Sequence, residues 1–215
     1  MSERITDPAG IEARSMQIID EELRKRGVSL PREELIVLRR VIHTTADFDY
    51  VRNLVFLGGA ARAGIRALGA GVDVVTDTNM AKAGVSRPAL ARLGGEAHCF
   101  VGDDDVAQAA RASGNTRATM AMRKALRELP GAVVAVGNAP TALFELCERM
   151  RDGARPALVI AVPVGFVNVV EAKEETIACC EELGVPAIVA RGRKGGSTVA
   201  TAIINALAYD AAGLR

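Results

Sequence analysis

The hydrophobic pattern near the start of the chain predicts two amphipathic helices. Between residues 10 and 26 the apolar side chains recur at about 100° per residue and therefore fall on one broad arc. The arc consists of Ile11, Met16, Ile18, Ile19 and Leu23. Gly27 ends this helix, and a second helix is predicted from Pro31 to His43, because proline and the acidic residues after it suit a first helical turn.

Farther along the chain, short aliphatic runs alternate with helical patterns. Short aliphatic runs are typical of strands that are buried on both faces of a sheet. Strands are predicted at residues 73–78, around His98, and at 133–136, 157–162 and 187–190. Helices are predicted at residues 58–71, 113–129, 140–150, 168–184 and 197–208, with a short helix after 79, a turn at Ser86-Arg87-Pro88 and a helix that opens at Asp103. This alternation predicts one α/β domain over residues 1–215, with a largely parallel sheet and helices on both faces in a Rossmann-like three-layer arrangement.

Polar turns at the ends of the predicted strands are candidate binding positions, because ligands of open α/β sheets collect there. Gly137-Asn138 precedes a helix start whose backbone N–H groups are unpaired, so this turn is either an anion site or an ordinary strand-to-helix connection. The loop at 191–197 gives a stronger anion signal, since it carries three cations and three glycines. Neither turn has the spacing of a nucleotide fingerprint, so the anion need not be a nucleotide.

Three further positions each have two interpretations. Ser15 lies within the apolar arc, where a hydroxyl either bonds to its own helix carbonyl or contacts a ligand. Thr116 and Arg117 open a predicted helix, and a guanidinium there suits a carboxylate or phosphate, although a surface arginine is an equally simple explanation. His43 is flanked by two arginines on its helix and is the main candidate for proton transfer, although a lone histidine more often has a structural role.

Composition narrows the class of protein. The 215 residues are 49% hydrophobic and 3% aromatic, with no tryptophan and a formal net charge of +1, which argues against a dedicated nucleic-acid binder. No apolar run is long enough to span a bilayer, and the first residues lack the apolar core of a signal peptide, so we expect a cytoplasmic protein without membrane contact. The four cysteines lack CxxC spacing and are expected to be buried or inert, and the aspartates at 103–105 are expected to open a helix, so no metal site is predicted.

Six long motifs run through nearly the whole chain. They are IEARSMQIID, RRVIH, GNTRATMAM, VVAVGNAPTALFEL, PALVIAVPVGFVNVVEAKE and VARGRKGGS. Together and in this order they resemble the precorrin-8X methylmutase family, which includes the cobalt-precorrin-8 enzymes of cobalamin biosynthesis.

The resemblance implies an isomerase that needs no cofactor. Its substrate would be precorrin-8X or cobalt-precorrin-8, and a methyl group would move from C-11 to C-12 of ring C to give hydrogenobyrinic acid or cobyrinic acid. The resemblance further implies that His43 protonates, or hydrogen-bonds to, the ring C region. It also implies that Ser15, Arg40, Thr116 and Arg117 contact the substrate. The sequence leaves open whether the ring carries cobalt.

Four more residues lie in the matching motifs, and their contact with substrate is predicted from their position at strand ends. These residues are Asn138, Arg191, Arg193 and Ser197. A homodimer is expected, partly from the resemblance and partly because helices rich in small residues pack closely and two-fold pairing is the commonest assembly.

Two other functions remain as alternatives. A non-catalytic corrinoid carrier would use the same arginines, and turnover would then survive the loss of His43 or be absent altogether. An α/β enzyme acting on nucleotides or phosphosugars would use the 191–197 loop and would show affinity for phosphates.

Overall fold

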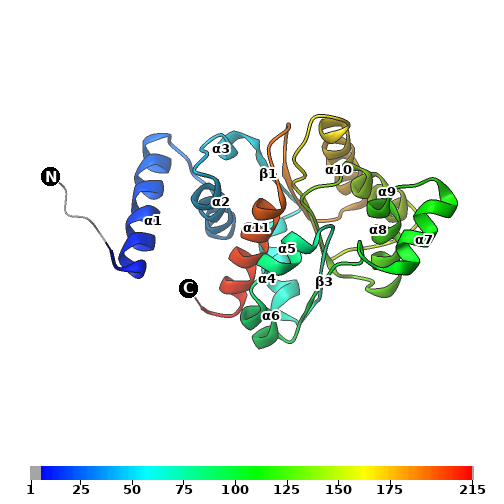
Figure 1. Ribbon diagram of the computed structural model, residues 1–215. Coiled ribbons are helices and arrows are strands. Elements are labelled where there is room, and N and C mark those ends of the chain that lie inside the picture. The colour runs from blue at the N-terminus through cyan, green and yellow to red at the C-terminus, as the bar shows by residue number, and fades with distance from the viewer. Residues whose placement is uncertain (1–5, 215) are drawn as a thin grey trace.

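Six short strands form one sheet at the centre of the computed structural model, which describes residues 6–214 (Figure 1). The strands are β1 Leu54–Leu57, β2 Val74–Thr76, β3 Ala97–His98, β4 Val133–Val136, β5 Leu158–Ala161 and β6 Ala187–Ala190. Their order across the sheet is β1-β6-β5-β4-β2-β3, and every neighbouring pair except β1 with β6 is parallel. The predicted largely parallel sheet is therefore confirmed.

Helices cover both faces of this sheet. They are α1 Pro8–Lys25, α2 Arg32–Thr45, α3 Tyr50–Asn53, α4 Ala60–Gly69, α5 Asn79–Gly84, α6 Arg87–Leu93, α7 Asp104–Ser113, α8 Arg117–Glu128, α9 Pro140–Arg151, α10 Val169–Leu183 and α11 Ser197–Ala211. Side chains of α2, α4 and α11 form one hydrophobic cluster with the strands, whereas α8, α9 and α10 contribute to a second cluster. Figure 1 shows these two groups of helices on opposite sides of the sheet, which confirms the predicted three layers.

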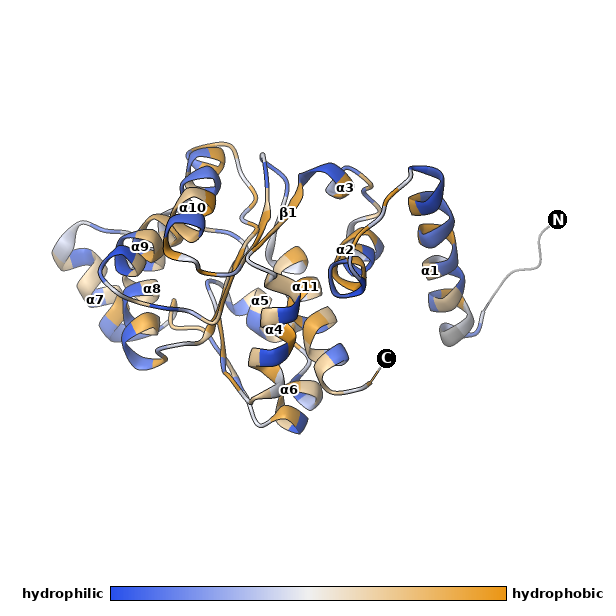
Figure 2. Ribbon diagram, turned by 180° about the vertical axis from the view of Figure 1, so that it is seen from behind, coloured by the Kyte–Doolittle hydropathy of each residue, from blue (hydrophilic) through white to orange (hydrophobic). Residues whose placement is uncertain are grey.

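The central strands are hydrophobic on both faces because both faces are covered. Every residue of β4, β5 and β6 is buried, and Figure 2 shows these strands in the hydrophobic colour. The edge strand β1 runs antiparallel to β6, with Leu54 opposite Ala190, and it was not predicted. Its four apolar residues are too few to show whether they belong to a strand or to the end of a helix.

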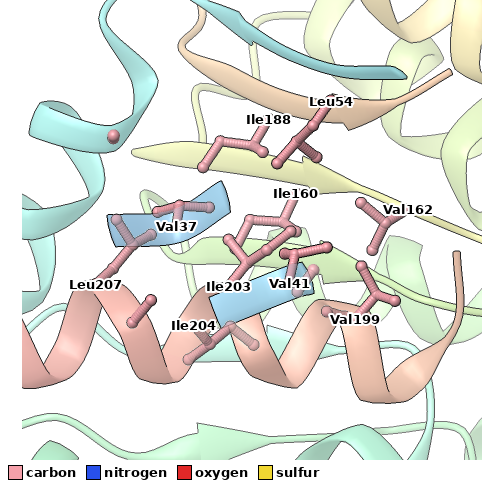
Figure 3. Packing of buried hydrophobic residues seen from close by; sticks show 14 of the residues in the cluster. Val37, Val41, Leu54, Ile160, Val162, Ile188, Val199, Ile203, Ile204 and Leu207 are labelled. Carbon is pink, nitrogen blue, oxygen red and sulfur yellow. The ribbon is translucent and has the colours of Figure 1, made fainter. Parts of the chain in front are cut away.

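Helix α11 supplies much of the packing on one face of the sheet. Figure 3 shows Ile203 and Leu207 of α11 beside Ile160 and Ile188 of the central strands, with residues of α2 close by. Gly64 explains the small-residue helix α4, since a Cβ there would lie 2.8 Å from side-chain carbons of both Leu158 and Leu207. The glycine permits close contact between α4 and the core, as expected for a packing helix.

Helix α1 lies at one end of the molecule, beyond α2 (Figures 1 and 2). Ile19 and Leu23 of its predicted apolar arc are buried, but Ile11 and Ile18 are each 48% exposed. The predicted amphipathic helix is present, but in this single chain α2 covers only part of its apolar arc.

Three local predictions are corrected or refined. Ser86 is the N-cap of α6 and accepts a hydrogen bond from the Ala89 N–H, so the predicted turn is a helix start. His98 lies in a two-residue edge strand, half-buried, and pairs with Asp73 at 3.3 Å, so it does not enter the core. Asp103 is the N-cap of α7, which confirms that the three aspartates open a helix.

The four cysteines are free thiols in the described part of the chain. Cys147, Cys179 and Cys180 are buried and Cys99 is half-buried, and none of them forms a disulfide within residues 6–214. Burial raises the pKa of all four thiols, to about 12 for Cys147 and Cys180, which makes them poor nucleophiles. None of the described helices is both long and apolar enough to cross a bilayer. Residues 1–5, on which part of the signal-peptide expectation rests, and residue 215 lie outside the described part of the chain.

Candidate functional site

The sheet changes its direction of winding between β2 and β4. From β4 the chain adds β5 and then β6 toward one edge, whereas β3 is added beside β2 toward the other edge. The carboxyl ends of β2 and β4 therefore flank the crevice in which open α/β sheets usually hold ligands. Asp77 directly follows β2, and Gly137 directly follows β4.

Asp77 fills the Gly137-Asn138 turn, for which the sequence left open an anion site or an ordinary strand-to-helix connection. Its carboxylate is 6% exposed and accepts hydrogen bonds from the N–H groups of Gly137, Asn138 and Ala139, each at 2.8 Å. Burial raises the pKa of Asp77, while the three N–H donors act in the opposite direction. The anion held by these backbone groups is thus a side chain of the protein itself, which excludes an open backbone site at this turn and favours the ordinary strand-to-helix connection. The side chain of Asn138 is exposed beside it.

Ser197 lies next to this turn. Its hydroxyl forms a 2.8 Å hydrogen bond with the hydroxyl of Thr78, which also caps α5 by accepting from the Ala81 N–H. A Cβ added to Gly137 would lie 2.8 Å from the Cα of Ser197, so only glycine fits where the end of β4 meets the start of α11. The carboxyl ends of β2 and β4 and the start of α11 therefore meet at one place.

The basic loop at 191–197 is less open to an anion than its composition suggests. The Arg191 guanidinium pairs with Glu174 at 3.1 Å. Lys194 pairs with Asp47 and Asp49 at 2.5 and 2.6 Å. Arg193 instead lies over the exposed ring of Phe166, 5.5 Å from its centroid, and forms no ion pair within residues 6–214. Of the three predicted cations, Arg193 is thus the one available to a new anion without breaking an existing pair.

Helix α2 places Arg40 and His43 one turn apart, and Ser15 lies one turn after Glu12, the α1 residue that pairs with Arg40. His43 is half-buried in the last turn of α2 and has no hydrogen bond or ion pair with any other described residue. Arg40, three residues earlier and on the same helical surface, is 18% exposed and pairs with Glu12 of α1 at 3.1 Å through both terminal nitrogens. The Ser15 hydroxyl donates to the Ile11 carbonyl at 2.8 Å, so its local interaction is with its own helix.

Two surface hollows meet at Arg40 and Tyr209. One has a volume of about 640 Å³ and lies between α1, α2 and α11. The other, of about 460 Å³, is also lined by Thr44, Met80 and Thr198, and so lies between the end of α2 and the starts of α5 and α11. Since Thr44 follows His43 and Thr198 follows Ser197, the second hollow joins the histidine region to the strand ends.

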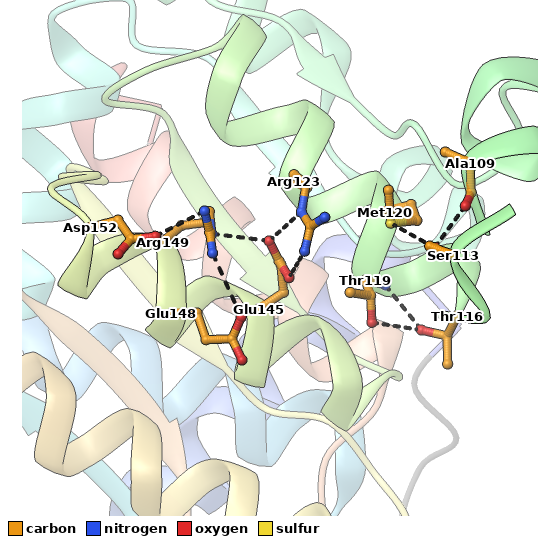
Figure 4. Close-up of polar contacts among 10 residues, drawn as sticks. All are labelled: Ala109, Ser113, Thr116, Thr119, Met120, Arg123, Glu145, Glu148, Arg149 and Asp152. Carbon is orange, nitrogen blue, oxygen red and sulfur yellow. Dashed lines mark hydrogen bonds and ion pairs between the residues drawn. The ribbon is translucent and has the colours of Figure 1, made fainter.

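Helix α9 starts just after the turn at the end of β4, and the start of α8, where Figure 4 labels Thr116, is bonded to it. Thr116 caps α8, accepting from the Thr119 N–H at 3.1 Å, and its hydroxyl also forms a 2.9 Å hydrogen bond with that of Thr141 in the first turn of α9. Arg117 follows Thr116, is exposed, and has no ion pair within the described range. Thr116 and Arg117 therefore lie beside the turn that carries Asn138.

A buried carboxylate locks these two helices together. Glu145 of α9 is 3% exposed and accepts two 2.8 Å hydrogen bonds from Arg123 of α8 (Figure 4). Arg149 also approaches the same carboxylate, at 3.1 Å. This bidentate pair fixes α8 on α9 and so fixes the positions of Thr116 and Arg117 at the helix start.

Sequence reasoning missed Asp77, Glu145 and a buried lysine, Lys173. Asp77 had a usable signal, since a carboxylate directly after a buried strand lies at the ligand-binding edge. Glu145 and Lys173 had none, because charged residues in helices usually face solvent and the pattern does not identify the exceptions.

Comparisons with known proteins give a consistent result. The family model described as Precorrin-8X methylmutase matches residues 10–210. The cobalt-precorrin-8 methylmutase of Priestia megaterium is 42% identical over 201 residues, which cover 93% of this chain and 87% of that protein. The precorrin-8X methylmutase of Pseudomonas aeruginosa is 41% identical over 214 residues, which cover 98% and 99%. The crystal structure of a precorrin-8X methylmutase from Thermus thermophilus matches with a TM-score of 0.85 and 43% identity, covering 95% of this chain and 97% of that one.

Proposed function

The chain belongs to the precorrin-8X methylmutase family, and we propose that it moves a methyl group from C-11 to C-12 of ring C in precorrin-8X or cobalt-precorrin-8. The product is hydrogenobyrinic acid or cobyrinic acid. The observation that carries the proposal is the position of His43, which belongs to the RRVIH motif and whose helix neighbours Arg40 and Thr44 line one hollow. The reaction is an isomerisation without net loss of electrons or atoms, so it requires no redox cofactor.

We assign proton donation to His43. An imidazole that is not engaged by other described residues is free to donate to the ring C region of a bound substrate. One positioned acid typically contributes a factor of about 10² to 10⁴ in rate. The remainder of the acceleration is assigned to holding the macrocycle in one reactive conformation.

The carboxylates of the substrate are assigned to the arginines around the strand ends. Arg117 and Arg193 are exposed and have no ion pairs with described residues, which suits them to receive a carboxylate directly. Arg40 and Arg191 already pair with Glu12 and Glu174, so a substrate carboxylate would share or replace those partners.

Four polar side chains complete the proposed set of substrate contacts. They are Ser15, Thr116, Asn138 and Ser197. The hydroxyls of Thr116 and Ser197 are already held by Thr141 and Thr78, so each would meet the substrate in a fixed orientation. Pre-ordered groups of this kind lose little conformational entropy on binding.

We also propose a cytoplasmic homodimer. Ile11 and Ile18 on the outer side of α1 are each 48% exposed, and a second copy would cover them. The unpaired cysteines suit a reducing compartment. The oligomeric state is tested by light scattering of the wild type against an Ile11→Lys/Ile18→Lys variant, which we expect to be a monomer.

The function is tested by incubating the purified protein with precorrin-8X and, separately, with cobalt-precorrin-8. A ¹³C label in the C-11 methyl group follows the migrating carbon by NMR, while the visible spectrum follows conversion. Appearance of the label at C-12 supports the isomerase, and the substrate converted faster identifies the route. Binding of either compound without movement of the label would instead indicate the corrinoid carrier.

A further inference from the structure

Lys173 of α10 is a buried cation that the proposed chemistry does not use. Its side chain is 0% exposed, and its Nζ donates to the backbone carbonyls of Gly192 and Lys194, each at 2.8 Å. Within residues 6–214 no carboxylate pairs with it. Burial of an ammonium group is costly, and an aliphatic side chain would fill the same space more cheaply, so core packing alone does not explain this residue.

The two carbonyls that Lys173 holds belong to the 191–197 loop, whose backbone is fixed at further points. The Gly196 N–H donates to the Val162 carbonyl at 2.8 Å, and the Gly165 N–H donates to the Arg193 carbonyl at 3.2 Å. A Cβ on Gly195 would lie 2.1 Å from the Val162 carbonyl oxygen, which leaves no room for a side chain. The loop is thus held against the end of β5, with Arg193 exposed to solvent.

The same loop is joined to the segment that follows His43. Helix α2 ends at Ala46, whose φ of 53° turns the chain out of the helix. Directly after it, Asp47 and Asp49 both pair with Lys194. One residue of the loop therefore contacts Lys173 through its carbonyl and the end of the histidine helix through its side chain.

We propose that Lys173 is a positioning residue for substrate binding. By holding the Gly192 and Lys194 carbonyls inward, it sets the path of the loop that carries Arg193 and leads to Ser197. Through Lys194 it also fixes the loop relative to the segment that follows His43. This inference rests on the proposed function, because the loop is assigned there to the substrate carboxylates.

The test uses Lys173→Met, which keeps the apolar stem but removes both hydrogen bonds. It is compared with the wild type and with a control, Lys25→Met, at the exposed end of α1. We expect Lys173→Met to raise KM about tenfold while kcat changes much less, because the reacting centre at His43 is not in contact with Lys173. Lys173→Gln, which keeps one donor, should give an intermediate KM. An unchanged KM in folded Lys173→Met, or an equal fall of kcat and kcat/KM, overturns the proposal.

A second measurement needs no activity. The loop contains three trypsin sites, at Arg191, Arg193 and Lys194, and we expect limited trypsin digestion to cut it about tenfold faster in Lys173→Met. Cleavage at Arg26, the exposed residue between α1 and Gly27, should be unchanged. If the loop is cut at the wild-type rate, Lys173 does not position it, whether or not the protein is a methylmutase.

If Lys173→Met does not fold, Lys194→Met decides. Its side chain is partly exposed, so its loss is tolerated, and it breaks only the connection to Asp47 and Asp49. We then expect faster cleavage at Arg193 and a raised KM, whereas wild-type values for both would overturn the proposal.

Discussion

Two neighbouring turns at the strand ends are built with opposite polarity. The turn at 137–139 directs three backbone N–H groups at a buried carboxylate, Asp77. The loop at 191–197 directs two backbone carbonyls at a buried ammonium, Lys173. The loop has three glycines and the turn has one, and both suggest an anion site from sequence alone.

In both turns the backbone N–H or carbonyl groups that could bind a ligand are already bonded to a charged side chain of the protein itself. At both turns the inward groups are already satisfied, so the proposed substrate would meet side chains such as Asn138, Arg193 and Ser197 and not a bare backbone cradle. Each buried charge then serves to hold side chains that lie on the outer surface of its turn.

The largest expected effect is on the loop that Lys173 holds. Gly195→Ala would place a Cβ 2.1 Å from a backbone oxygen, at a φ of 158°, and neither atom can move aside without shifting the main chain. We expect a loss of about 3 kcal/mol or more in the free energy of unfolding, measured with urea. Gly102→Ala, whose Cβ would meet only a side-chain nitrogen at 3.7 Å, is the matched control and should unfold like the wild type. Equal stability of the two variants would show that the loop is not held tightly.

The next effect concerns the turn held by Asp77. In Asp77→Asn the amide can accept on one oxygen only, so at least one of the three buried N–H groups loses its partner. We expect a loss of about 2–3 kcal/mol, because unsatisfied buried donors and lost charged hydrogen bonds are each costly. Asp104→Asn on the surface of α7 is the control. A variant as stable as that control would mean that the turn does not depend on the carboxylate.

The contribution of Lys173 to the free energy of unfolding depends on pH. Burial lowers its pKa from 10.5 to about 8, so between these values the unfolded chain keeps a proton that the folded lysine has lost. The unfolded state then binds more protons, and the contribution of Lys173 to the free energy of unfolding rises with pH across this window, by about 3 kcal/mol. The measurement is the difference between the wild type and Lys173→Met in urea at pH 7.5 to 10.5, in which other titrating groups cancel. A difference that stays flat or falls would contradict the lowered pKa.

The smallest expected effect concerns Arg40, a proposed substrate contact that already pairs with Glu12, a carboxylate of the chain itself. Glu12→Gln should free Arg40 and tighten substrate binding about two- to fivefold, since a partly exposed ion pair is worth about 0–1 kcal/mol. Titration of the change in visible absorbance measures the Kd, with Glu21→Gln on the same helix as control. Weaker binding in Glu12→Gln would mean that Glu12 holds Arg40 in its binding position.

Most helices and strands can be predicted from local hydrophobic patterns. Most ion pairs within the candidate site cannot. The strands at 133–136 and 187–190 are continuous aliphatic runs, so the sequence alone predicts them. β1 was missed because four apolar residues have no periodicity to measure. An amphipathic arc also does not say how much of it the same chain will cover, and Ile11 and Ile18 of α1 stay exposed.

At the site, sequence predicts which residues are present but not which are already paired. Lys194 and Asp47 are 147 residues apart along the chain, and Arg40 and Glu12 are 28 apart, so neither pair has a local signal. By contrast, Thr116 was placed correctly at the start of α8, because capping depends on neighbours only three residues away.

The single-turnover rate of His43→Asn, measured with substrate fully bound, tests most directly whether His43 is the proton donor. His98→Asn is the matched histidine control. We expect His43→Asn to bind substrate nearly as well as the wild type but to convert it about 10² to 10⁴ times more slowly. The conversion rate of His98→Asn should stay close to that of the wild type. Conversion by His43→Asn within about threefold of the wild-type rate would contradict the assignment of the proton donor.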